Sequence, residues 1–124
     1  MTQINRVFLL LEGTSFAVAG LIHSGLLGTG RHQPASIAES SLAVVLLVGL
    51  MLTWVWPARV RLISMGAQTI ALLGTLVGAF TIAIGIGPRT LPDIIFHVTI
   101  LAVLACGLVV SARAEQQIKE ESFR

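Results

Sequence analysis

Residues 62–87, LISMGAQTIALLGTLVGAFTIAIGIG, contain no charged side chain. A helix needs about 20 predominantly apolar residues to cross a hydrocarbon core roughly 30 Å thick, so this stretch predicts a membrane-spanning helix. In lipid a chain satisfies its backbone only as a helix or as a closed barrel, and this stretch lacks the apolar–polar alternation of barrel strands. Similar stretches occur at about residues 7–29, 37–56 and 91–112. The sequence therefore predicts an all-α integral membrane protein, a four-transmembrane-helix bundle.

The whole chain, residues 1–124, is expected to form one domain, in which residues 113–124 are a cytoplasmic tail that prolongs the fourth helix. The composition is 55% hydrophobic and 11% charged, with a mean hydropathy of +0.90, which excludes an ordinary soluble domain. The net charge of +2 is too small and too dispersed to suggest a nucleic-acid partner. The partner expected from composition is the lipid bilayer.

Basic residues divide unequally between the two sides of the predicted bundle. Short cytoplasmic loops of membrane proteins carry an excess of Lys and Arg, so the richer side is expected to face the cytoplasm. This predicts that both termini are cytoplasmic, in a plasma (inner) membrane of the bacterial type. The richer side has Arg6, Arg59, Arg61, Arg113, Lys119 and Arg124, and the opposite side has Arg31 and Arg89.

The two halves of the chain resemble each other at an offset of 58 residues. Each half contains a helix, a Gly-x-Gly segment, an arginine and a proline before the next helix. We interpret this as a tandem duplication of a two-helix hairpin, with parallel repeats related by a pseudo-twofold axis along the membrane normal. The same offset aligns Glu39 of the first half with His97 of the second half. The other matched pairs include Arg31 with Arg89, Pro34 with Pro92, and Gly49 with Gly107.

Ionisable residues within a membrane helix are costly and are therefore candidates for a functional site. Counting along the helices predicts an outer layer made of His23, Glu39, Asp93 and His97, below Arg31 and Arg89. It predicts a smaller inner layer in which Glu12 meets Gln68. Glu12 there is either a protonated side chain that bridges two helices or a proton-carrying group.

The two outer carboxylates have a purely structural interpretation as well. Ser36-x-x-Glu39 and Thr90-x-x-Asp93 both match the capping box, in which the acidic side chain bonds the backbone at the start of a helix. Pro34 and Pro92 suit helix starts. The sequence leaves open whether Glu39 and Asp93 are caps or parts of a site.

The histidines favour a binding site in the outer layer. Asp93 and His97 are four residues apart and share a helix face, so the carboxylate is placed to orient the imidazole. His23 is expected at a similar depth on a neighbouring helix. We predict that His23, Glu39 and His97 bind a ligand or metal ion, with Asp93, Arg89 and Arg31 supporting them.

Small residues mark the first and third helices, and such stripes permit close helix packing. Because these stripes offer more packing surface than one bundle needs, we expect a homo-oligomer. The stripes are Gly13, Ala17, Gly20, Ser24 and Gly28, and Gly74 with Gly78.

Three functions remain open from the sequence, and an enzyme is not expected because no catalytic motif occurs. The first is binding or transport of a small polar ligand, a proton or a transition metal through the outer site. The second is a redox protein that holds haem b or a quinone with His23 and His97. The third is an accessory structural subunit of a larger membrane complex.

Overall fold

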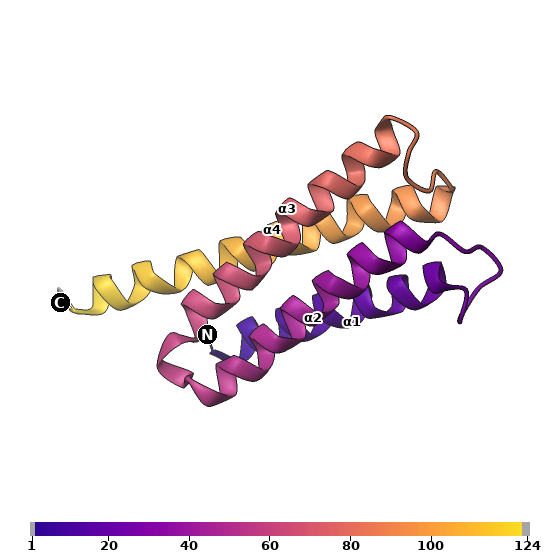
Figure 1. Ribbon diagram of the computed structural model, residues 1–124. Helices are drawn as coiled ribbons and strands as arrows, with labels where there is room; N and C mark the ends of the chain where they lie inside the picture. The colour runs from indigo at the N-terminus through magenta and orange to yellow at the C-terminus, as the bar shows by residue number, and fades with distance from the viewer. Residues whose placement is uncertain (1, 123–124) are drawn as a thin grey trace.

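The fold is a bundle of four long helices (Figure 1). The computed structural model describes residues 2–122, and the side chains of residues 2–113. The helices are α1 (Thr2–Ser24), α2 (Gln33–Val55), α3 (Val60–Ala83) and α4 (Leu91–Ser122), and a short 3-10 helix, η1 (Pro57–Arg59), joins α2 to α3.

Each of the four helices is long and apolar enough to cross a membrane, so the predicted fold class is confirmed. The described residues form no strand. The fourth helix continues into the predicted tail as far as Ser122, and residues 123–124 lie outside the described part of the chain. This chain is therefore a small all-α membrane protein.

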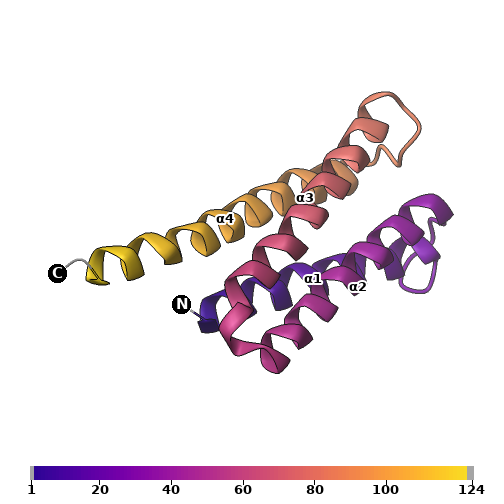
Figure 2. The same cartoon turned by 60° about the vertical axis from the view of Figure 1, so that its left-hand side comes forward.

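The helices form two hairpins, α1 with α2 and α3 with α4, and α2 packs on α3 (Figure 2). Segments 25–32 and 84–90 lie together at one end of the bundle, which we call the loop end. The two termini and η1 lie at the opposite end, the terminus end. The two termini lie at the same end, as expected for a chain that crosses the membrane four times. The side of the membrane on which this end lies stays a prediction.

Two predicted helix ends are wrong by several residues. The first helix was expected to reach residue 29 and ends at Ser24, and the third was expected to reach residue 87 and ends at Ala83. Gly25 and Gly85, which follow these ends, both have φ of +86°. This left-handed conformation costs glycine little and stops a helix. The apolar loop residues beyond them made the helices look longer in the sequence.

Polar side chains are buried inside the bundle together with an apolar core, and many large apolar side chains lie on its outer surface. Val7, Met51 and Val98 are more than 60% exposed, as expected for side chains that face lipid. Leu9, Phe16, Leu46 and Leu104 come from three helices and pack at the centre with less than 3% exposure. Among residues 2–113 the buried polar side chains are those of Asn5, Glu12, Glu39, Thr53, Ser64, Gln68, Thr75, Asp93 and Ser111.

The tandem repeat stays a prediction. α2 and α4 begin at Gln33 and Leu91, which differ by the proposed offset. Two hairpins of similar length produce the same spacing without a duplication, so helix starts alone do not establish a repeat.

The glycine stripes pack within the chain. A Cβ at Gly13 would lie 2.8 Å from Leu47 of α2, and one at Gly74 would lie 2.8 Å from Leu42 of α2. The close approach that these residues permit is therefore used inside the bundle. The predicted homo-oligomer receives no support from the stripes and stays a prediction.

Three helices meet through a buried group that we call the Glu12 cluster, made of Asn5, Glu12, Gln68 and Ser111. The Gln68 amide nitrogen donates to Glu12 Oε1 at 3.1 Å and to Oε2 at 3.2 Å. The Ser111 hydroxyl lies 3.2 Å from Asn5 Oδ1 and 3.3 Å from Gln68 Oε1 and donates to either. The contact expected between Glu12 and Gln68 is thus present, and the cluster fastens α1, α3 and α4 together.

Gly107 leaves the space that the Glu12 cluster occupies. A Cβ at Gly107 would lie 2.2 Å from the Gln68 amide nitrogen and 2.7 Å from Glu12 Oε1. Gly107→Ala should therefore displace the buried pair and lower the free energy of unfolding by about 1–3 kcal/mol. Unfolding in mild detergent, followed by circular dichroism, measures this loss.

Gly66→Ala is the matched control, because no atom lies within 4 Å of a Cβ at Gly66. Alanine in a helix is more favourable than glycine by about 1 kcal/mol, so this variant should be at least as stable as the parent. Equal stability of the two variants would contradict the packing described for Gly107.

Candidate functional site

Polar side chains also gather near the loop end, where we define the His23 trio as His23, Glu39 and Asp93. His23 Nδ1 lies 2.7 Å from Glu39 Oε2, and His23 Nε2 lies 2.9 Å from Asp93 Oδ1. The three side chains are 12%, 6% and 10% exposed, respectively. The trio joins α1, α2 and α4, and it uses both nitrogens of the imidazole.

Close packing of α1 on α2 brings Glu39 to His23. The Ser36 hydroxyl donates to the backbone carbonyl of Gly20 at 2.9 Å. A Cβ at Gly20 would lie 2.6 Å from Ser40 Oγ, so the lack of a side chain there lets the helices approach. His23 occupies the last turn of α1, two residues before the left-handed Gly25.

The capping box predicted for Asp93 is present. The Thr90 backbone N–H donates to Asp93 Oδ2 at 3.1 Å, and the Thr90 hydroxyl also bonds Oδ2. The Asp93 N–H lies 3.4 Å from the Thr90 hydroxyl oxygen. Since Oδ1 contacts His23, Asp93 is both a cap and a member of the trio. The cap interpretation is therefore confirmed for this residue, and its part in a functional site stays a prediction.

Of the two interpretations that the sequence left open for Glu39, the structure does not support the capping box. α2 begins earlier than expected, at Gln33, and its N-cap is His32, whose Nδ1 accepts a hydrogen bond from the Ala35 N–H at 3.2 Å. Ser36 thus lies inside the helix and bonds α1 instead. Glu39 falls in the second turn, away from the free backbone N–H groups, and is not a cap.

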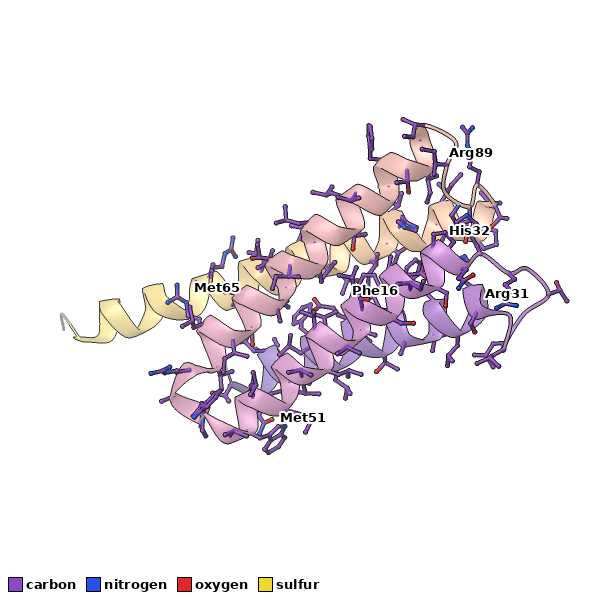
Figure 3. The ribbon with its side chains drawn as sticks, viewed as in Figure 1. Phe16, Arg31, His32, Met51, Met65 and Arg89 are labelled. Carbon is purple, nitrogen blue, oxygen red and sulfur yellow. The ribbon has the colours of Figure 1, made fainter. Side chains whose placement is uncertain are left out.

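A cavity of about 250 Å³ lies between α2 and α3 near the loop end. Glu39 and His97 line it, and Phe16 closes it toward the centre of the bundle. Most of its wall is apolar. The cavity reaches the loop end, because His32, Pro34 and Pro88 belong to its lining; Figure 3 labels Phe16 within the bundle and His32 near that end.

Glu39, which lines this cavity, has one side-chain oxygen without a hydrogen-bond partner among the described residues. His23 holds Oε2, whereas Oε1 is buried and has no hydrogen-bond partner among the described residues. Glu39 is only 5% exposed. A buried oxygen without a partner costs about 1–3 kcal/mol, and more when it is charged, so Oε1 is the atom at which a donor from a bound molecule would be most favourable.

His97 presents its second ring nitrogen toward α3. Its Nδ1 lies 2.8 Å from the Asp93 backbone carbonyl, which can only accept, so Nδ1 carries the hydrogen. A Cβ at Gly78 would lie 3.0 Å from His97 Nε2. His97 therefore fits beside α3 because position 78 has no side chain, and its orientation comes from a backbone carbonyl rather than from the Asp93 carboxylate.

The structure brings some of the predicted site residues together and separates others. Glu39 and His97 share the cavity, whereas His23 and Asp93 line a smaller one of about 140 Å³. Arg31 and Arg89 are exposed in the two loops (Figure 3). Glu12 and Gln68 belong to the separate Glu12 cluster.

The site does not fit the predicted metal or haem. Among the described residues, no group of three or more His, Cys, Asp or Glu side chains is arranged to hold a metal ion. Both nitrogens of His23 face carboxylates, so neither is available to an iron atom in this arrangement.

His32 lines the cavity as well, although it was not among the site residues predicted from the sequence. The signal was present, because Pro34 marks the first turn of a helix and the residue before that turn is the N-cap. Comparisons with protein families, curated proteins and solved structures find no match for this chain. The function therefore has to be argued from the site itself.

His23→Ala should destabilise the protein by about 3 kcal/mol, because it leaves two buried carboxylates without their shared partner. The control is His32→Ala, which leaves the trio's hydrogen bonds in place and removes a helix cap worth about 1 kcal/mol together with an edge contact to the His23 ring, whose centroid lies 6.4 Å away. Thermal unfolding of both variants in the same detergent measures the difference. A His23 variant no less stable than the His32 variant would show that the trio does not hold the helices together.

Proposed function

We propose that this protein binds a small amphipathic molecule within the membrane, in the cavity between α2 and α3. The observation that carries the proposal is Glu39 Oε1, a buried carboxylate oxygen without a partner on a residue that lines the cavity. In this proposal Oε1 accepts a hydrogen bond, or an ion pair, from the polar end of the ligand.

The lining supports an apolar body for the ligand. Apolar side chains make up most of the wall, and a few placed polar groups are what fixes the orientation of a molecule in such pockets. The apolar lining includes Phe16, Leu42, Val77, Ile82, Ile86 and Pro88.

The size and position of the cavity limit the ligand further. Its 250 Å³ lies just below the roughly 300–1,000 Å³ of ordinary ligand pockets, so the bound molecule is small. Glu39 lies six positions into α2, or about 9 Å along the helix. A ligand with its polar end at Glu39 would place its body between α2 and α3, beyond the first turn of α2.

A second buried oxygen without a partner, Ser64 Oγ, does not favour another site. Ser64 lies on α3 toward the terminus end and outside the lining of the cavity. A neutral hydroxyl also costs less to bury than a carboxylate. The proposal therefore rests on Glu39 alone.

Two probes with a common apolar body test the proposal: benzyl alcohol, which is neutral, and benzyltrimethylammonium, which is a permanent cation. Equilibrium dialysis against the protein in lipid nanodiscs, corrected with empty nanodiscs, measures their binding. At least one probe should bind saturably at one molecule per chain. Ala38→Phe, which places an aromatic ring at the cavity wall, should weaken binding at least about tenfold, equivalent to 1.4 kcal/mol.

Val44→Phe is the control, because Val44 lies on the same helix, is 60% exposed and lies outside the cavity lining. This variant should bind like the parent. If neither probe binds above the empty nanodiscs, or if both phenylalanine variants behave alike, the cavity is not a ligand site.

A further inference from the structure

The number of hydrogens in the His23 trio fixes its charge. Each of the two contacts, Nδ1 with Glu39 Oε2 and Nε2 with Asp93 Oδ1, needs one hydrogen between its atoms. Both hydrogens lie on the imidazole, or one lies on the imidazole and one on a carboxyl. In either arrangement the trio carries one net negative charge.

Only one atom of the trio is free to take up a further proton. Asp93 Oδ2 already accepts from the Thr90 N–H and hydroxyl, and Oδ1 faces His23. Glu39 Oε2 is also engaged. The remaining oxygen is Glu39 Oε1, which lacks a partner. This atom is therefore either a charged acceptor, with the trio negative, or a protonated carboxyl, with the trio neutral.

Few other charges face Glu39. α1 brings His23, α4 brings Asp93 and His97, and the start of α2 brings His32. α3 contributes none, since its one charged residue, Arg61, lies in its first turn at the terminus end and residues 62–83 contain no ionisable side chain. The cavity wall thus offers no permanently charged cation among the described residues, and a buried negative charge without one is costly.

The geometry points to a cationic ligand, an amine or quaternary ammonium with a small apolar body, that exchanges with a proton at Glu39 Oε1. When the cation enters, the Oε1–H bond breaks and one proton leaves to water. When the cation leaves, one proton returns. The site, counted with its ligand, then has no net charge in either state: the bound cation neutralises the trio in one, and the proton on Oε1 neutralises it in the other. This inference rests on the proposed ligand site and adds the charge of the ligand and its competition with protons.

The dissociation constants of benzyltrimethylammonium and benzyl alcohol, measured in nanodiscs over about pH 5 to 8, test the exchange. The cation should bind more weakly as the pH falls, approaching about tenfold per pH unit where Oε1 is protonated, because one proton competes with one cation. The affinity of the alcohol should change much less, since a hydroxyl donates to a carboxylate and accepts from a carboxyl.

Two variants separate Glu39 from its neighbours. Glu39→Gln keeps the shape of the side chain but not its charge, and it should weaken binding of the cation at least about tenfold and flatten its pH profile. His97→Gln should keep the pH profile, because the competing proton lies on Glu39. A flat profile in His97→Gln would assign the proton to His97 and overturn the inference.

The outcomes also separate this inference from the proposed function. Binding of benzyl alcohol without binding of the cation, or equal pH profiles for the two probes, would leave the cavity as a ligand site and overturn the exchange. Absence of binding by both probes would overturn the two proposals together.

Discussion

The rest of this bundle depends on the two hydrogen bonds that the His23 ring makes, one with Glu39 and one with Asp93. Lipid offers no partners to polar groups, so the three side chains satisfy one another and draw α1, α2 and α4 together. α3 has no part in the trio and is fastened nearer the terminus end, where Gln68 bonds Glu12. α2 and α3 therefore diverge toward the loop end (Figures 1 and 2), and the cavity lies between them.

The same interaction gives the cavity its chemistry. His23 holds one oxygen of Glu39 and so fixes the carboxylate, while the second oxygen stays without a partner. Asp93 cannot play this role, because Thr90 occupies its other oxygen. Two carboxylates that look alike in the sequence thus differ in the structure. One completes a helix cap, and the other keeps a buried oxygen without a partner, which is the acceptor in the site that we propose.

The sequence predicts the membrane helices well, because they depend on composition. Counting along the helices also places Glu12 at the depth of Gln68, which it contacts, but it does not show that His23 and His97 line different cavities. Helix ends were less predictable: Gly25 and Gly85 stop helices within apolar sequence through a backbone conformation that hydropathy does not reveal. The early start of α2 changed Glu39 from a cap into a cavity residue. The pairing of His23 with both carboxylates depends on the packing of α1, α2 and α4, which spacing along a single helix cannot give.

The carbon-13 signal of the Glu39 carboxyl tests the central claim most directly. Solid-state NMR of protein labelled at the glutamate side-chain carboxyl, in bilayers, reports each glutamate, and the Glu39 signal is assigned by its loss in Glu39→Gln. On addition of benzyltrimethylammonium the Glu39 signal should move, while that of Glu12, which lies in a separate cluster with Gln68, should stay in place. An unmoved Glu39 signal, or a shift of Glu12 instead, would contradict the account.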